Sequence, residues 1–393
     1  MNGFLAVERA VRSAAPHALL DAARAALITH YEAASVDLLM ADYGLTVLQP
    51  VTALPHTAQP PLSLHASPEG RAFGSQEPYG QYAALDGAVD LHLPVTVRGD
   101  RLGILTVRLP KRRCTPQAVD ELTDLAAFLG HEIVVAERDT DLYLQARRAN
   151  RLTLAAEMQW QLLPGRSCSR DEYAIGAQLE PAYAIYGDNF DWATTADTLT
   201  LSVTNGMGEG IQASLLTNLA VNALRNARRA GIDIADQAAL ADQALYAQHH
   251  GEQHVSTLLL SFDLATGRAQ VVDAGSPQLW RQRDKAVERV PFEAQFPLGM
   301  FEDTPYVPQD FEVLPGDRLI IVSDGVYATA GRDAEAYGER SLARAIQAAS
   351  LLPAAAVPRA VLRELAEHRG DTATDDELVV CLDWFGPSTP TTR

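Results

Sequence analysis

Oxygen-bearing side chains and glycines recur where the expected strands of this sequence end. The stretch Leu199–Gly210, LTLSVTNGMGEG, alternates apolar and polar residues and then enters a glycine-rich turn at Asn205 and Gly206. Such alternation is typical of a half-buried strand. Glycine lets the backbone approach a ligand closely, and carbonyl and side-chain oxygens are the ligands that hard cations prefer. The turn is therefore a candidate cation site, although a glycine-rich turn alone is weak evidence.

Three further acidic segments strengthen this interpretation. The expected strand LIIVSDG ends at Asp324, and Asp375 and Asp376 directly precede the hydrophobic strand ELVVCL. The turn GDNFD at 187–191 contains Asp188. Each aspartate by itself could simply mark a turn. Acids that recur at strand ends, separated by whole elements, together predict a metal site assembled by the tertiary fold.

In this order and with these surroundings, the motifs resemble the metal-dependent protein phosphatases of the PPM, or type 2C, family. The bacterial branch that contains SpoIIE and RsbU is the most similar, and the resemblance covers roughly Leu152 to Trp384. The matching segments are QWQLLP (159–164), GDNFD (187–191), NGMGEG (205–210), AGSP (274–277), PLGM (297–300), LPGDRLIIVSDGV (314–326) and DDELVV (375–380).

The resemblance implies a catalytic metal centre. Asp188 would bind one ion, Asn205 would occupy the position that bridges two ions, and the backbone carbonyl of Gly206 would be a further ligand. Asp324 and Asp375 would hold the other ion. Two Mn²⁺ or Mg²⁺ ions about 3.5–4 Å apart activate a water and neutralise the phosphoryl oxygens. Because no cysteine or serine lies in a nucleophile motif, no covalent phosphoenzyme is expected.

The chain departs from the family pattern at four positions, which are Asn205 for the bridging aspartate, Ser276 for a histidine, Leu378 for a threonine and Tyr186 for a glycine. The amide of Asn205 offers one oxygen and no charge, so a two-ion centre loses part of its neutralisation. Asp376 and Glu209 are candidates for compensating acids. Two hypotheses remain: an active phosphatase with altered metal affinity, or a pseudophosphatase that acts as a regulatory binding module.

The resemblance also implies a class of substrate. Members of this branch dephosphorylate a serine or threonine on small STAS-domain proteins, the antagonists of anti-sigma factors. We therefore expect a serine/threonine phosphoprotein phosphatase of bacterial signalling, with a phosphorylated STAS-domain protein as its partner.

The N-terminal region has the element order of a sensor domain. Residues 1–31 have helical periodicity, two hairpins are expected at 35–51 and 88–110, and a helix runs from Gln117 to about Glu137. Helix, hairpin, loops, hairpin and helix is the order of a GAF domain. We assign residues 1–131 to a GAF-like α/β sensor domain that controls the phosphatase.

Residues 132–163 contain neither glycine nor proline and predict one long helix. Leu142, Ala146, Ala149 and Leu152 recur at helical spacing along it. Such a stripe fits a connector packed on its own domains, or a parallel helix through which the chain forms a homodimer.

Strand and helix patterns alternate through residues 164–385, and 386–393 read as a flexible tail. Many antiparallel strands with segregated helices predict a sandwich. With the resemblance, the expected fold class is α+β, with a C-terminal αββα sandwich of the PPM type.

Composition bears on the partners and the location of the protein. The 393 residues carry a net charge of −18, which argues against a nucleic-acid or anionic membrane surface. The three cysteines lie far apart without CxxC spacing, as expected in a reducing cytoplasm. The N-terminus does not resemble a signal peptide, and no stretch approaches ~18 apolar residues. A cytoplasmic location is expected.

Overall fold

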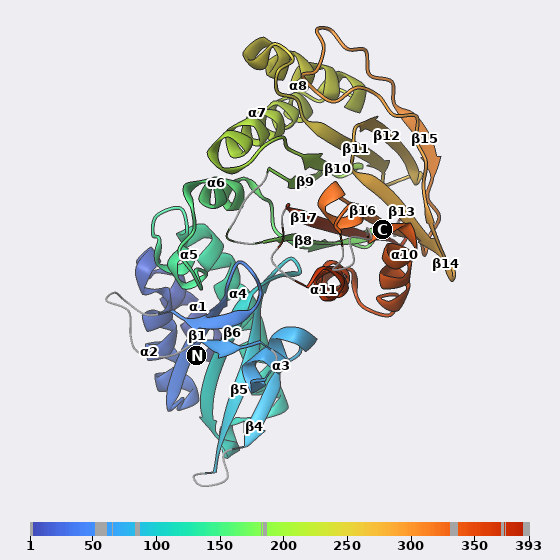
Figure 1. The fold of residues 1–393 in the computed structure, drawn as a ribbon. Coiled ribbons are helices and arrows are strands. Elements are labelled where there is room, and N and C mark those ends of the chain that lie inside the picture. Colours follow the sequence, from blue (N-terminus) through green and yellow to red (C-terminus); the bar gives the residue numbers. More distant parts are fainter. Residues whose placement is uncertain are drawn as a thin grey trace. The chain divides into compact units, whose positions relative to one another are not determined.

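The computed structural model describes residues 3–51, 61–64, 66–82, 87–181, 183, 187–330, 337–370, 373 and 375–387. The chain divides into two compact units, Met1–Arg151 and Leu152–Arg393 (Figure 1). Each unit is described by itself.

The N-terminal unit is built on one antiparallel sheet in the order β3-β2-β1-β6-β5-β4. Its strands are β1 Ser35–Ala41, β2 Val47–Pro50, β3 Leu62–Ser63, β4 Tyr79–Tyr82, β5 Ala88–Val97 and β6 Asp100–Pro110. Its helices are α1 Gly3–Arg12, α2 Leu19–Tyr31, α3 Pro68–Ser75, α4 Pro116–Ala136 and α5 Leu142–Ala146, with short 3₁₀ turns at Pro16–Ala18 and Lys111–Arg113. The two predicted hairpins and the helix after them are confirmed.

Alternation along the strands gives this sheet two buried faces. Val36, Leu38 and Met40 of β1 pack with α1, α2 and α4 in the larger core. Leu39 and Ala41, which point the other way, pack with α3. This arrangement follows from the period of two along a strand.

The segment 132–163 is not one helix, so that prediction is wrong. α4 ends at Ala136, α5 is a short helix, and α6 begins at Leu154. Thr140 accepts a hydrogen bond from the N–H of Leu142, and Thr153 accepts one from Ala156. These hydroxyls satisfy the first N–H groups of new helices, which interrupts the helix that apolar periodicity alone suggests.

The two ends of this segment belong to different units. Tyr143 of α5 is buried in the core of the N-terminal unit, where its hydroxyl donates to the carbonyl of Pro16 at 3.0 Å. α6 instead packs in the C-terminal unit, where the hydroxyl of Ser214 donates to the carbonyl of Ala155. A homodimer through a continuous helix therefore lacks the element on which that prediction rested.

The C-terminal unit contains two antiparallel sheets, ordered β15-β12-β11-β10-β9 and β14-β13-β16-β17-β8-β7. The strands are β7 Ser167–Ser169, β8 Tyr173–Glu180, β9 Asn189–Thr194, β10 Thr198–Asn205, β11 Ser256–Asp263, β12 Arg268–Ala274, β13 Gln278–Arg283, β14 Ala286–Arg289, β15 Gln309–Glu312, β16 Arg318–Val322 and β17 Glu377–Trp384. The helices are α6 Leu154–Leu162, α7 Gly210–Arg229, α8 Ile234–His249, α9 Asp324–Tyr327, α10 Gly338–Ala348 and α11 Val357–Arg369, with a 3₁₀ turn at Ala354–Ala356.

These elements stack as four layers. Leu201 and Val203 of β10 pack against Ile321 of β16 and Val380 of β17, which places one core between the sheets. α7 and α8 cover the outer face of the first sheet, and α10 and α11 cover the second (Figure 1). The predicted α+β class and the sandwich are confirmed.

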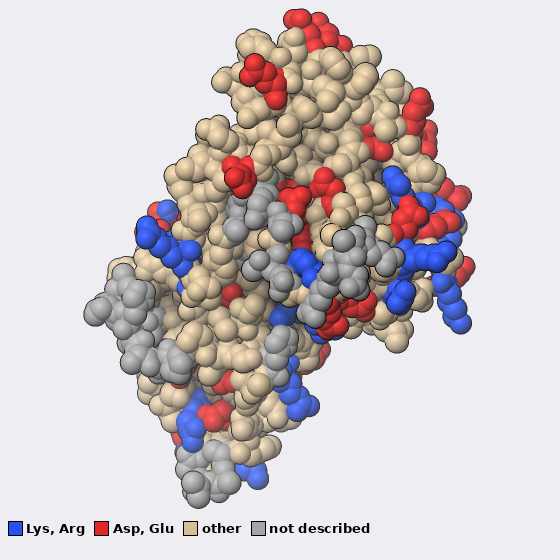
Figure 2. All heavy atoms as spheres, viewed as in Figure 1, with Lys and Arg blue, Asp and Glu red and all other residues tan. Residues whose placement is uncertain are grey.

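Acidic and basic side chains lie beside one another on the surface of this unit (Figure 2). Arg283 binds Asp317 at 2.8 Å, and Arg281 binds Glu288 at 2.5 Å. Among the described helices, none is both long and apolar enough to cross a membrane.

Candidate metal centre

The candidate centre forms where the two sheets of the C-terminal unit meet at one edge. Asn189 at the start of β9 pairs with Thr204 near the end of β10, so Asp188 and Asn205 flank the same edge of the first sheet. Val322 at the end of β16 pairs with Val379 near the start of β17, which brings Asp324 and Asp375 to one edge of the second sheet. Antiparallel pairing thus places the predicted residues together in pairs.

Asp376 joins the two pairs. Its Oδ2 accepts the N–H of Gly187 at 2.8 Å and the N–H of Asp188 at 3.0 Å. Its own N–H donates to Oδ1 of Asp375 at 2.9 Å. A buried carboxylate that accepts two backbone N–H groups fixes their positions firmly. Asp376 therefore holds the segment of Asp188 against the second sheet.

Asp188 is buried, with 1% of its surface exposed. Burial, and after it the carboxylate of Asp376, raises the pKa of Asp188 well above the ordinary aspartate range, while a hydrogen bond with Ser323 opposes the rise. Asp324 and Asp375 add to the increase. Oδ2 of Asp188 has no hydrogen-bond partner among the described residues. This is an environment in which a cation would stabilise the ionised carboxylate.

Asp324 follows β16 directly and is half-buried. Its Oδ1 is a buried oxygen without a hydrogen-bond partner in the described part of the chain. The adjacent Gly325 is required by space, because a Cβ there would lie 2.0 Å from the carbonyl oxygen of Asp376. Burial raises the pKa of Asp375, and the neighbouring Asp324 raises it further. The two acids are therefore close enough to influence each other.

Asn205 uses one of its two polar side-chain atoms for a hydrogen bond to a neighbouring turn. Its Nδ2 donates to Oγ of Ser276 at 2.8 Å. Ser276 is itself held, since its carbonyl accepts the hydroxyl of Tyr327 at 2.9 Å. Burial, and then the charge of Asp324, raises the pKa of Tyr327 to about 12, so this hydroxyl stays a donor at neutral pH.

Gly206 lies in close contact with the turn that carries Asp188. A Cβ on Gly206 would lie 2.6 Å from the carbonyl oxygen of Gly187 and 2.7 Å from Oγ1 of Thr217. Thr217, on α7, donates to that same carbonyl at 2.6 Å. Only glycine fits this position, which explains the residue type in NGMG.

The chemistry of these residues fits a hard divalent cation. Buried carboxylate oxygens without partners and a glycine turn provide the oxygen ligands that Mg²⁺ and Mn²⁺ prefer. In the described residues, however, no three His, Cys, Asp or Glu side chains are close enough to hold a metal ion as they stand. Carboxylates without a counter-ion repel one another, so the ligands have reason to draw together only around a cation.

Several further residues support the acids of the centre, and the motifs indicate only some of them. Thr217 and Tyr327 lie within helices, and Ser323 accepts the N–H of Leu378 at 3.1 Å while its own hydroxyl donates to the carbonyl of Asp376. Gln159, at the start of the motif QWQLLP, is fully buried and donates to the carbonyl of Asp188. Its place in that motif was the available signal for a role in the site.

Glu209 and Asp191, two other acids of the motifs, do not contribute ligands to the candidate centre. Glu209 precedes α7 with an exposed side chain, so it does not compensate for Asn205. Asp191 lies within β9 rather than in a turn, and it pairs with Arg225 and Arg228 of α7. Tyr186 lies outside the described residues.

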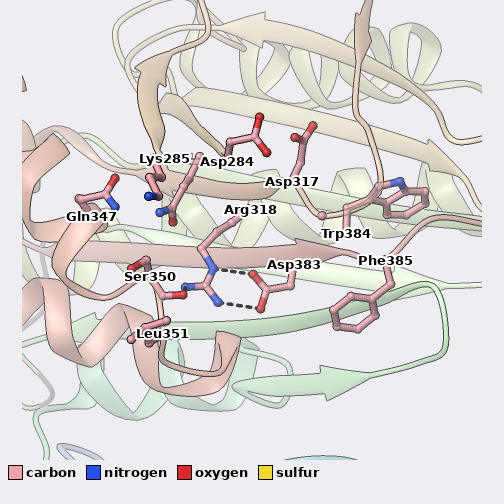
Figure 3. Close-up of a pocket in the computed structure, with 12 residues that line it drawn as sticks. Asp284, Lys285, Asp317, Arg318, Gln347, Ser350, Leu351, Asp383, Trp384 and Phe385 are labelled. Carbon is pink, nitrogen blue, oxygen red and sulfur yellow. Dashed lines mark hydrogen bonds and ion pairs between the residues drawn. The ribbon is translucent and has the colours of Figure 1, made fainter.

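A pocket of about 490 Å³ opens at the opposite end of the second sheet (Figure 3). Arg318, at the start of β16, binds Asp383 near the end of β17 through two hydrogen bonds of 2.5 and 2.9 Å. The guanidinium also donates to the backbone carbonyl of Leu352. Since Asp324 follows the other end of β16, about 15 Å away by strand rise, this pocket is separate from the candidate metal centre.

The C-terminal unit is similar to proteins of a known family. Residues 195–385 match the family model for stage II sporulation protein E (SpoIIE). The phosphoserine phosphatase RsbU of Bacillus subtilis (strain 168) is 20% identical over 203 residues, which are 51% of this chain and 61% of RsbU. The match thus spans less than two thirds of that relative.

A solved structure shows the same fold as the C-terminal unit. The SiaA-PP2C domain of Pseudomonas aeruginosa superposes with a TM-score of 0.50 at 21% identity, over 58% of this chain and 93% of that domain. The RsbU and RsbW domains of Rv1364c from Mycobacterium tuberculosis align with a TM-score of 0.48 at 22% identity, over 56% of this chain and 61% of theirs.

Proposed function

We propose that this chain, whose C-terminal unit is a PP2C-type domain of the SpoIIE and RsbU branch, is a metal-dependent serine/threonine phosphoprotein phosphatase. One observation carries the proposal. The buried Asp188, with an oxygen that has no partner in the described residues, lies where the two sheets join and near enough to Asp376, Asp324 and Asp375 for their charges to raise its pKa.

The candidate ligands divide between the sheets. Asp188, Asn205 and the carbonyl of Gly206 would bind an ion from the first sheet, and Asp324 and Asp375 would bind one from the second. Bound Mn²⁺ or Mg²⁺ would supply a water nucleophile at neutral pH and neutralise charge on the phosphoryl group. The chain's own part is positioning: Asp376 fixes the backbone of Asp188.

The substrate that we propose is a phosphorylated STAS-domain protein, an antagonist of an anti-sigma factor. Support comes from the similarity to RsbU, a protein named as a phosphoserine phosphatase. We further propose that the N-terminal unit controls the reaction as a GAF-like sensor. Its order of helix, hairpin, short elements, hairpin and helix supports this assignment. A cytoplasmic location stays a prediction.

A second candidate function is favoured by Asn205. An amide at the bridging position, held by Ser276, suits a pseudophosphatase that binds a phosphorylated partner without turning it over. The presence of Asp188, Asp324 and Asp375 favours catalysis instead, because a site without turnover has no need of these acids.

Phosphate release from a phosphoserine peptide separates the two functions. We expect turnover with Mn²⁺ or Mg²⁺ and none with chelator. Asn205→Asp should raise turnover by about 10- to 100-fold, because it restores a charged bridging ligand. If the folded wild-type chain binds the peptide in millimolar Mn²⁺ but releases no phosphate, the binding module is the correct function.

A further inference from the structure

We propose that the metal centre holds one divalent cation tightly, between Asp324 and Asp375, and that a second position beside Asp188 and Gly206 fills only at much higher metal concentration. The inference rests on the proposed metal-dependent function. It concerns how many ions the centre retains, which follows from the contacts of Asn205.

Asn205 offers a cation a single, neutral ligand atom. Its Nδ2 is engaged with Oγ of Ser276 at 2.8 Å, and an amide nitrogen cannot bind a cation. This leaves Oδ1 as its sole ligand atom. An aspartate at the same place would offer two oxygens and a negative charge, one oxygen for each ion.

Ser276 has little freedom to release the amide. Its carbonyl accepts the hydroxyl of Tyr327 at 2.9 Å, which ties the turn after β12 to α9 of the second sheet. The preceding Gly275 packs against Ser256, because a Cβ there would lie 2.3 Å from Oγ of Ser256. The turn is therefore fixed from two directions, and Asn205 is held with its nitrogen toward Ser276.

The two halves of the centre differ in charge. On the second sheet, Asp324 and Asp375 give two carboxylates. On the first sheet, Asp188 gives one carboxylate, and Gly206 adds only a neutral carbonyl. The nearby Asp376 does not serve as a free ligand there, because its Oδ2 already accepts the N–H groups of Gly187 and Asp188. The number of charged ligands is a main determinant of affinity for hard divalent ions. The position between Asp324 and Asp375 should therefore fill first.

The position beside Asp188 also carries a higher cost of dehydration. Asp188 is 1% exposed, so a cation there must lose most of its water for one carboxylate and neutral oxygens. Mg²⁺ in particular gives up water reluctantly. We expect the second ion to bind at least about 100-fold more weakly than the first, as the loss of one charged ligand implies.

Metal content tests this inference without reference to activity. The full chain is stripped with chelator and dialysed against Mn²⁺ from micromolar to millimolar concentration. Bound metal per chain is then measured, together with the electron paramagnetic resonance spectrum. We expect one ion per chain in the micromolar range, with the spectrum of isolated Mn²⁺.

Three variants complete the test. Asn205→Asp should take up a second ion and show the spectrum of a coupled Mn²⁺ pair. Asp324→Ala should lose the tightly bound ion. Asn226→Asp, which makes the same chemical change on the exposed surface of α7, should remain at one ion. Circular dichroism in the presence of Mn²⁺ confirms that each variant is folded.

The possible results separate a failure of this inference from a failure of the proposed function. Two ions of similar affinity in the wild type would overturn the inference and leave the proposed function intact. An Asn205→Asp variant that is folded and still retains one ion would overturn the role given to Asn205. No bound metal in either protein would overturn the metal-dependent function itself.

Discussion

Asn205 removes one negative charge from a group of acids that already disfavour one another's ionisation. Burial and the Asp376 carboxylate raise the pKa of Asp188, and Asp324 contributes to the raised pKa of Asp375. A fifth carboxylate at position 205 would add to this repulsion when no metal is bound. The amide therefore stabilises the metal-free protein and lowers its affinity for metal ions. Stability and function are commonly opposed in this way at functional sites.

Gly206 gives a direct test of the close packing around Asp188. We expect Gly206→Ala to destabilise the C-terminal unit by about 1–3 kcal/mol, because its Cβ would overlap the carbonyl of Gly187 and Oγ1 of Thr217. It should also weaken Mn²⁺ binding, since both contacts position the turn of Asp188. Denaturant unfolding and metal titration measure the two effects.

Gly231→Ala is the matched control for that variant. Gly231 has a φ of +78° and open space around it, so alanine there costs about 1–2 kcal/mol through backbone strain. It lies after α7, away from the acids, and metal binding should not change. Equal loss of Mn²⁺ affinity in both variants would show that general instability, rather than the contact at Gly206, is responsible.

The motifs indicated the acids of the candidate site more clearly than the residues that support them. Asp188, Asp324 and Asp375 are recognisable because each stands at a strand end next to a glycine or a second acid. Thr217 and Tyr327 could not be predicted, because a helical pattern does not show which distant carbonyl a side chain will meet. The contact between Asn205 and Ser276 likewise depends on the register of strands far apart in sequence.

At the level of elements, the connection between the units shows where periodicity misleads. Apolar residues at helical spacing run through 132–163, yet the helix is interrupted twice. Thr140 and Thr153 bond to the N–H groups that follow them, and short polar side chains of this kind compete with helix continuation. Thr115, beside a proline, was recognisable as a cap, whereas Thr153 has no such neighbour.

Thr153→Ala distinguishes an interrupted segment 132–163 from one continuous helix. The two arrangements predict changes of opposite sign in the free energy of unfolding. As the cap of α6, Thr153 accepts from Ala156 at 3.2 Å, so its loss should destabilise the C-terminal unit by about 1 kcal/mol. Within a continuous helix, the same change would stabilise by up to about 0.7 kcal/mol, because alanine is the better helix former. Denaturant unfolding monitored in the C-terminal unit gives the sign.

Thr115→Ala provides the comparison for this measurement. Thr115 caps α4 in the same way, with a hydrogen bond from Ala118 at 3.2 Å. Its loss should cost about 1 kcal/mol in the N-terminal unit. A stabilising effect of Thr153→Ala beside a destabilising effect of Thr115→Ala would mean that residues 132–163 form one helix in solution.

At the scale of the whole chain, most of the fold was accessible from the sequence. The strands of the sandwich alternate clearly, and the hairpins end at turn residues such as Arg98 and Gly99, both at positive φ. The short strands β7 and β14 escaped prediction because a few residues carry little periodicity. Control of the phosphatase by a GAF-like unit stays a prediction, because no local sequence pattern encodes such control.

The most direct test of the central claim is Mn²⁺-dependent hydrolysis of p-nitrophenyl phosphate by the full chain and by Asp324→Ala. Asp310→Ala is the matched control, because Asp310 is an exposed aspartate of β15 that contacts the exposed side chain of Arg268 and the amide of Gln270. We expect Asp324→Ala to lower turnover at least about 100-fold, since it removes a metal ligand, and Asp310→Ala to leave it unchanged. Turnover that survives in a folded Asp324→Ala variant would contradict the assignment of this metal centre.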